Sequence, residues 1–150
     1  AKTSPEVQSL IDGARSRVRT APLREESLPG PTGESNQLME FSRGVVLCLG
    51  PQQADVDEQL KLAQEHGCSP ISAVGLDPRL LLNLKGFDAV MHFGSHHELR
   101  PIREALAKRE GAILPLIASI DDLVLLIAER HVCIDTTASG GNTALLAAQA

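Results

Sequence analysis

Three histidines lie within six residues of one another, at His92, His96 and His97. Imidazole nitrogens are common ligands of zinc and related metals, so this segment is a candidate metal site. However, no nearby carboxylate or thiol completes a four-ligand set at a recognised spacing. We interpret the segment as a polar loop in which Ser95 caps the next helix, and we assign the three histidines no role.

His131 and Cys133 are two residues apart, a spacing that places both side chains on one side of a β-strand. A thiol beside an imidazole can act as a nucleophile beside its base, but no oxyanion hole can be placed next to this pair. The chain has three cysteines, Cys48, Cys68 and Cys133, with no Cys-x-x-Cys spacing. We expect buried free thiols with a structural role, and a reducing compartment.

Other polar groups have simpler interpretations. The adjacent carboxylates Glu25 and Glu26 are typical of a solvated loop, and Asp121 and Asp122 favour a helix N-terminus. The sequence Gly140-Gly141-Asn142 tolerates positive φ, so it can form a tight turn that presents amides to an anion, or a packed arm. We favour the packed arm because the residues around it are apolar and small.

From residue 44 onward, apolar strand patterns alternate with amphipathic helix patterns. We expect strands at residues 44–49, 70–74, 87–93, 112–117 and 132–134, and helices at 54–66, 77–84, 95–109 and 121–130. Short connections between alternating strands and helices predict a parallel sheet with helices on both faces. The predicted fold class is therefore α/β, a Rossmann-like three-layer arrangement with four to five parallel strands.

The first part of the chain has a different pattern. A helix is expected over residues 4–19, with Ser4 as N-cap and Pro5 in the first turn, and one apolar face made of Val7, Leu10, Ile11 and Ala14. Residues 21–36 are rich in Pro, Gly and Glu and predict a linker or surface loop.

A short strand is plausible at residues 37–41. It could pair with 132–134 as a two-stranded flap, leaving four strands in the parallel core. Because an isolated two-stranded ribbon is only marginally stable, we expect this flap and residues 136–150 to be mobile.

In a doubly wound sheet, ligands bind outside the carboxyl ends of the strands. The first such turn has Gly50 and Pro51 where a dinucleotide fingerprint needs Gly-x-Gly-x-x-Gly, and no phosphate loop of the Gly-Lys-Ser/Thr type occurs. We therefore expect no cofactor in this chain. A nucleotide- or anion-binding regulatory site near Gly50, Gly75 and Gly94 stays as the alternative.

The composition excludes several classes of function. The chain of 150 residues is 43% hydrophobic and 22% charged, with a net charge of -5, and only Phe41, Phe87 and Phe93 are aromatic. Single-stranded nucleic acids are usually bound by aromatic rings in a basic groove, so we expect no nucleic-acid partner. No apolar run approaches the length of about 20 residues that spans a bilayer, and no signal peptide is recognised. The first residue is Ala1, which suggests a piece of a longer protein.

Five segments together resemble a known family. They are residues 28–36 (Leu-Pro-Gly-Pro-Thr-Gly-Glu-Ser-Asn), 43–49, 87–90, 109–113 and 136–142 (Thr-Thr-Ala-Ser-Gly-Gly-Asn). In this order they are similar to the far C-terminal region of proline utilization A, a family of large bifunctional enzymes that oxidise proline to glutamate. The resemblance covers essentially the whole chain.

The resemblance implies a non-catalytic C-terminal domain, similar to the Rossmann domain of the aldehyde dehydrogenase superfamily. Such a domain packs on the aldehyde dehydrogenase module of the same polypeptide and helps to close an internal tunnel, and a homodimer is one possible setting for that contact. FAD and NAD would then belong to the parent enzyme alone. That parent would be a cytoplasmic bacterial protein, associated with membranes at most peripherally.

The resemblance also implies specific segments. A docking motif maps to Thr136, Thr137, Ala138, Ser139, Gly140, Gly141 and Asn142, and a linker loop maps to Gly30, Pro31, Thr32, Gly33 and Glu34. Asp135 and Ser139 replace the more usual Asn and Ala. The expected division is a helix and linker over 1–36, a Rossmann-like domain with flap over 37–135, and a docking motif and tail over 136–150.

Overall fold

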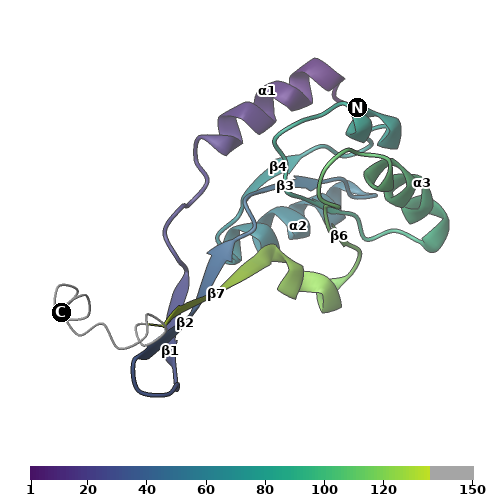
Figure 1. Ribbon diagram of the computed structural model, residues 1–150. Helices are drawn as coiled ribbons and strands as arrows, with labels where there is room; N and C mark the ends of the chain where they lie inside the picture. The colour runs from purple at the N-terminus through teal and green to yellow at the C-terminus, as the bar shows by residue number, and fades with distance from the viewer. Residues whose placement is uncertain (136–150) are drawn as a thin grey trace.

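The computed structural model describes residues 1–135 of the chain, and it contains two separate sheets (Figure 1). The larger sheet has four parallel strands in the order β4-β3-β5-β6. Their bounds are β3 (Val45–Cys48), β4 (Ser69–Ser72), β5 (Ala89–Met91) and β6 (Leu116–Ile117). This confirms the predicted Rossmann-like α/β class with four strands in the parallel sheet.

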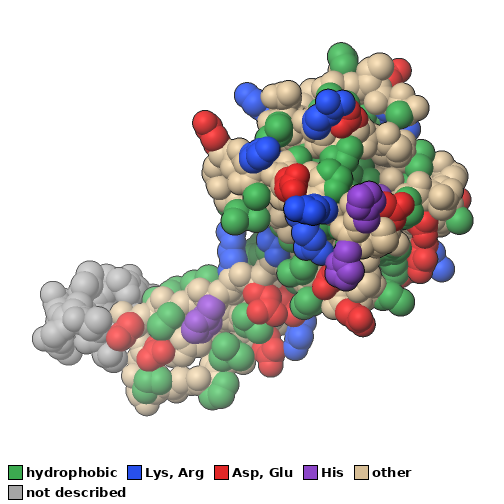
Figure 2. All heavy atoms as spheres, turned by 90° about the vertical axis from the view of Figure 1, so that its right-hand side faces the viewer, with side chains coloured by type: hydrophobic (Ala, Val, Ile, Leu, Met, Phe, Trp, Pro, Cys, Tyr) green, Lys and Arg blue, Asp and Glu red, His purple; other side chains and the backbone are tan. Residues whose placement is uncertain are grey.

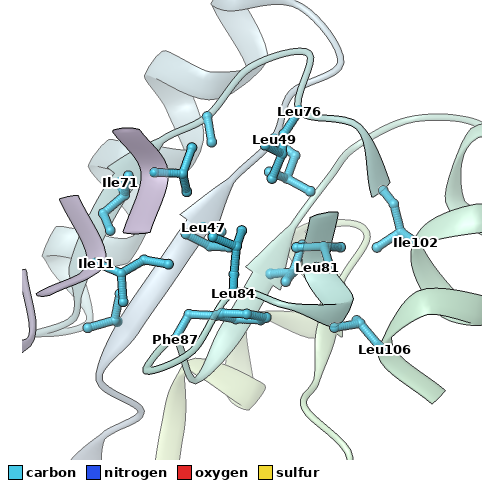
Figure 3. Close-up of a cluster of buried hydrophobic side chains, with 14 of the residues drawn as sticks. Ile11, Leu47, Leu49, Ile71, Leu76, Leu81, Leu84, Phe87, Ile102 and Leu106 are labelled. Carbon is cyan, nitrogen blue, oxygen red and sulfur yellow. The ribbon is translucent and has the colours of Figure 1, made fainter. Parts of the chain in front are cut away.

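Both faces of the parallel sheet are covered, as the continuous apolar run of β3 predicts. Val45 and Leu47 point to one face, where α1 (Ser4–Arg15), the 3₁₀ helix η1 (Pro78–Leu82) and α3 (His96–Ala107) pack (Figure 3). Val46 and Cys48 point to the other face, against α2 (Gln53–Glu65) and the 3₁₀ helix η2 (Ile120–Leu126). All four side chains have no exposed surface, so the sheet is the middle layer of three.

The second sheet, which we call the flap, has three antiparallel strands and extends away from the Rossmann-like body (Figure 1). Its order is β1 (Arg24–Leu28), β2 (Glu34–Ser42) and β7 (Ile127–Asp135). The predicted segments 37–41 and 132–134 lie in β2 and β7, which do pair, but residues 132–134 lie opposite 35–37, so Gln37 and Val132 are the one pair that both ranges share. The prediction of two strands is wrong, because β1 pairs with β2 along its whole length.

The strand β1 was not predicted because its sequence, Arg-Glu-Glu-Ser-Leu, carries no alternation of apolar and polar residues. Four of its five residues are exposed, so nothing in its side chains marks a buried face. Its backbone hydrogen bonds to β2 make it a strand. Residues 21–36 are therefore not simply a linker.

The helix predicted over 121–130 is also wrong. A 3₁₀ helix, η2, ends at Leu126, and Ile127 already pairs with Ser42 in the flap. Consequently the fifth predicted strand lies in the antiparallel flap and not in the parallel sheet. Pairing with a distant strand overrides a local pattern that was compatible with a helix.

Smaller differences concern the ends of helices. Thr3 precedes α1 and forms the capping box, since its amide donates to Glu6 Oε2 at 2.6 Å, so Ser4 is not the N-cap. The helix ends at Arg15, four residues earlier than expected, and Leu10 is 42% exposed while the other three predicted apolar positions are buried. The expected helix over 77–84 is a 3₁₀ helix over Pro78–Leu82, and the Asp77 side chain caps it by accepting the amide of Arg79.

Candidate functional site

The carboxyl edge of the parallel sheet is where this fold usually places a ligand. The turns after β3, β4 and β5 surround a cavity of about 240 Å³ at this edge. Its lining is mostly apolar, with one imidazole and one carboxylate: Leu49, Pro51, Gly75, Leu76, Pro78, His92, Glu98 and Ile102. The glycines of the alternative anion site, Gly50, Gly75 and Gly94, lie in these same three turns.

The backbone of Gly50 is hydrogen-bonded inside the protein. Its amide donates to Gln59 Oε1 at 3.2 Å, and Gln59 Nε2 donates back to the Gly50 carbonyl at 2.7 Å. The same carbonyl accepts the amide of Phe93 at 2.7 Å. Gln59 has no exposed surface, so its side chain is a fixed internal partner of this turn. The amide that would face a pyrophosphate is therefore already used.

At the N-terminus of α2, too, the backbone donors that could bind an anion are missing or occupied. Pro51 has no amide hydrogen, and the amide of Gln52 donates to Asp55 Oδ2 at 2.9 Å. A carboxylate at this place interacts favourably with the helix dipole, and it would repel a phosphate. The residues of the first turn do not fit a dinucleotide pyrophosphate.

His92 is buried at the end of β5, and its ring is an acceptor. The amide of Gly94 donates to His92 Nδ1 at 3.1 Å. Burial lowers the pKa of His92 from its ordinary value, and the nearby carboxylates of Glu98 and Asp55 only partly oppose that effect. The cavity therefore contains a neutral imidazole.

The histidine segment is not assembled as a metal site. His96 and His97 are exposed in the first turn of α3, and no group of three potential metal ligands forms within residues 1–135. Ser95 caps α3 as predicted, because its side chain accepts the amide of Glu98 at 3.4 Å, while the amide of Ser95 donates to Glu98 Oε2 at 2.7 Å.

The cysteines do not form a reactive centre. Cys48 is buried, and burial raises its pKa to about 12. Cys133 is exposed on β7, so the expectation of a buried thiol is wrong there, because β7 is exposed from Glu129 to Asp135. Its thiol donates to Glu34 Oε1 at 3.4 Å, and this hydrogen bond to a carboxylate raises the pKa of Cys133. A thiol with a raised pKa is a poor nucleophile at neutral pH.

Two of the four remaining acidic candidates have local partners. Glu26 pairs with Arg24 at 2.8 Å, and Glu25 is exposed on β1. Asp121 and Asp122 lie in the first turn of η2, as predicted, and Asp122 accepts the amide of Ala118 at 3.1 Å.

The predicted linker loop is the tip of the flap. Residues 29–33 connect β1 to β2, with Gly33 at a φ of 85° and the Glu34 amide donating to the Pro31 carbonyl at 3.0 Å. These glycine and proline residues form a hairpin turn within one sheet. The predicted docking motif, residues 136–142, lies outside the described residues.

A hollow that the sequence did not predict lies at the opposite, amino edge of the sheet. We call it the arginine cleft: a cleft of about 470 Å³ between the body and the base of the flap, lined among others by Arg15, Arg19, Arg43 and Arg130. Arg15 and Arg130 are 115 positions apart in the sequence, so no local motif predicts that these four arginines lie together.

The architecture and its site define a Rossmann-like α/β domain whose first turn lacks a phosphate-binding backbone. No family model matches the chain. The chain is 32% identical to the bifunctional protein PutA of Klebsiella aerogenes over 160 residues, covering 91% of this chain and 12% of that protein. It is 30% identical to that of Escherichia coli over 172 residues, covering 97% of this chain and 13% of that protein.

Solved structures agree. A crystal structure of bifunctional proline utilization A matches with a TM-score of 0.52 and 25% identity, over 73% of this chain and 14% of that one. A mutant of the Bradyrhizobium japonicum protein matches over the same shares with a TM-score of 0.51 and 25% identity. The chain is a PutA-related domain, and it spans about an eighth of the length of the relatives it matches. Within residues 1–135, none of the helices combines the length and apolar character needed to cross a membrane.

Proposed function

We propose that this chain is the non-catalytic C-terminal domain of a bifunctional enzyme that oxidises proline to glutamate. Its role is that of a lid, which helps to seal the tunnel through which the intermediate travels to the aldehyde dehydrogenase module. The relatives are named bifunctional PutA proteins, and the chain corresponds to a small share of their length. FAD and NAD would bind to modules elsewhere in that polypeptide, a cytoplasmic bacterial enzyme.

One observation carries the proposal: the internal closure of the first turn by Gln59. A Rossmann-like domain that bound NAD would leave the Gly50 amide and the start of α2 open to the pyrophosphate. Here Gln59 and Asp55 take both positions. A domain with the Rossmann-like fold but without a pyrophosphate-binding turn is better suited to covering another protein surface than to binding a cofactor.

The mechanism is exclusion of water. The intermediate of proline oxidation is in equilibrium with a reactive semialdehyde, and a sealed cavity keeps it from diffusing into bulk solvent. We propose that the segment of Thr136, Thr137, Ala138, Ser139, Gly140, Gly141 and Asn142 docks on the dehydrogenase module. The hairpin turn of residues 30–34 would face the same polypeptide or the second copy in a homodimer.

A truncation in the parent enzyme tests the lid. Removing the residues that follow position 135 here should leave each of the two half-reactions at its normal rate. It should also add a lag to NADH formation from proline, because the intermediate now equilibrates with solvent. A full-length parent enzyme with Arg103→Gln, a change on the exposed side of α3, serves as the control. Coupled turnover without a lag in the truncated enzyme would refute the tunnel-sealing role.

A second experiment addresses the alternative of a nucleotide-binding regulatory domain. NAD is titrated into the isotopically labelled chain, and amide shifts are followed by NMR. We expect no saturable shifts in the turns after β3 and β5 up to millimolar NAD. Saturable shifts clustered at Gly50 and Gly94 would establish a ligand site there instead.

A further inference from the structure

The arginine cleft lies at the narrow junction where the flap meets the body, and basic side chains gather at that junction in Figure 2. Five separate segments line it: the end of α1 with the residues after it, the junction of β2 and β3, Asp88 before β5, residues 112–115, and the first half of β7. It lies at the amino edge of the parallel sheet, opposite the carboxyl edge that holds the cavity at His92.

The cleft has an excess of positive charge. Among residues 1–135, its single acidic lining residue is Asp88, which pairs with Arg15 at 2.6 Å and also accepts the amide of Val45 at 2.8 Å. Within the described part of the chain, no carboxylate lies within ion-pair distance of Arg19, Arg43 or Arg130. Three uncompensated guanidinium groups therefore line one hollow of a chain whose net charge is -5.

These guanidinium groups are partly held in place. Arg43 donates from Nε to the Leu125 carbonyl at 2.8 Å and from Nη2 to the Ile127 carbonyl at 3.4 Å. The guanidinium of Arg130 lies 5.1 Å from the ring centroid of Phe41. A guanidinium has five N–H donors, so most donors at both residues still need an acceptor. Donors held in position lose little entropy when a carboxylate binds.

The cleft also has an apolar wall. Residues 112–115 line it, and Ile113 is 80% exposed in this loop. Arginine beside exposed aliphatic and aromatic side chains is the composition of protein–protein interfaces, where arginine is enriched. A small anion would use the charges and leave the apolar side chain in water.

We propose that the arginine cleft binds an acidic peptide segment that carries an apolar side chain, from a protein surface outside this chain. The four arginines come from three segments spread along the cleft, which suits several carboxylates on an extended strand of peptide. The inference deepens the proposed function: it rests on that function in taking the rest of the parent polypeptide as the source of the segment.

The test uses the full 150-residue chain and a synthetic probe, the blocked peptide Glu-Glu-Leu-Glu-Glu. Binding is measured by calorimetry, and the Arg Nε–H and Ile113 methyl signals are followed by NMR. We expect saturable binding that weakens as NaCl is raised, because exposed charge pairs are screened. The peptide Gln-Gln-Leu-Gln-Gln should not bind, and Glu-Glu-Gly-Glu-Glu should bind more weakly.

Variants locate the site. Arg130→Gln and Arg19→Gln should each weaken binding by about two- to fivefold, the range of a single exposed ion pair. Arg103→Gln on α3 removes the same charge far from the cleft and should leave binding unchanged. Urea unfolding of each variant checks that the fold is intact, and the second cleft variant keeps the test valid if one of them unfolds.

Three results would overturn the proposal. The first is that the acidic peptide shows no saturable binding. The second is that Arg130→Gln and Arg19→Gln bind the peptide as tightly as the wild type does, and the third is that citrate or inorganic phosphate binds more tightly than the peptide while the leucine adds nothing to the affinity. The last result would assign the cleft to a small anion. The lid itself is judged separately by the lag in NADH formation, so a failure here does not imply a failure there.

Discussion

The two edges of the parallel sheet are opposites in how their polar groups are satisfied. At the carboxyl edge, Gln59 and Asp55 occupy the backbone donors that a ligand would use, and the cavity beside them is small and mostly apolar. At the amino edge, Arg19, Arg43 and Arg130 have no acidic partner within residues 1–135. The edge where this fold normally binds ligands is closed, and the other one is open.

The difference shows that position in a fold does not by itself make a site. A turn at the end of a parallel strand binds phosphate only if its amides are free, and here one buried glutamine and one carboxylate occupy them. Conversely, the amino edge usually contributes to stability alone, but a flap attached beside it adds a second wall and turns it into a cleft. Function follows from unsatisfied groups, not from topology.

The largest expected effect is at the closed edge. Gln59→Ala leaves the amide and one acceptor bond of Gly50 without their buried partner and opens a cavity, so the free energy of unfolding should fall by about 2–4 kcal/mol. Urea unfolding followed by circular dichroism measures it. Gln64→Ala, an exposed position on the same helix, should stay within about 0.5 kcal/mol of wild type. Equal effects at both positions would mean that the glutamine does not close this turn.

The second prediction concerns the amino edge. Gly44 has a φ of +113°, and a Cβ there would collide with the Asp88 carboxylate that pairs with Arg15. Gly44→Ala should lower the free energy of unfolding by about 1–3 kcal/mol because the backbone is strained. Gly13→Ala in α1, where an added Cβ meets nothing closer than 3.7 Å, should instead stabilise by up to about 1 kcal/mol. Opposite signs in thermal melts support a rigid amino edge, and a neutral Gly44→Ala contradicts it.

A pH dependence should come from the closed edge. Because burial lowers the pKa of His92 in the folded chain, the unfolded chain takes up a proton first as the pH falls. The contribution of His92 to the free energy of unfolding is thus complete above its ordinary pKa of 6.5 and is lost as the pH falls from that value through the lowered pKa of the folded chain. Stability measured from pH 8 to pH 5.5 should decline less steeply in His92→Gln. The exposed His96→Gln should follow the wild-type curve, and a His92→Gln curve of unchanged slope would argue against a neutral buried imidazole.

The smallest effect is expected in the flap. Glu34 raises the pKa of Cys133 through a hydrogen bond, so Glu34→Gln should lower that pKa and speed the reaction of the thiol with a disulfide reagent a few-fold at pH 8. Glu25→Gln on β1 is the matched change of charge and should not alter the rate. Cys48, whose pKa is about 12, should react only on unfolding. A rate that is the same in both variants would mean that Glu34 and the thiol do not interact in solution.

Several elements could be predicted because their signals are local. The all-apolar run of β3 indicated a strand covered on both faces, and Ser95 indicated the start of α3. The strand β1 could not be predicted, since its charged residues are ordered only by their partner β2. The start of β7 was assigned to a helix for a related reason: Ile127 and Ala128 fit either structure, and pairing with Ser42 and Phe41 decides between them.

The candidate sites divide in the same way. The absence of a glycine fingerprint after β3 was visible in the sequence, because that motif requires particular residues at fixed spacing. That Gln59, nine residues further on, closes this turn could not be predicted without the structure, because a helix must first bring its side chain back to the strand. The arginine cleft was even less predictable, since its four arginines come together only when the flap pairs residues near 40 with residues near 130.

By itself, the sequence determined the parallel α/β body and the loss of a dinucleotide motif, because apolar periodicity and short motifs act through neighbours along the chain. Only the tertiary structure decided the third flap strand, the exposure of Cys133 and the contrast between the two edges. Each of those features depends on which residues, distant in the sequence, bond to a backbone donor, cover a face of a sheet or leave a charge unpaired. The spacing of residues along the chain does not specify which distant residues meet in space.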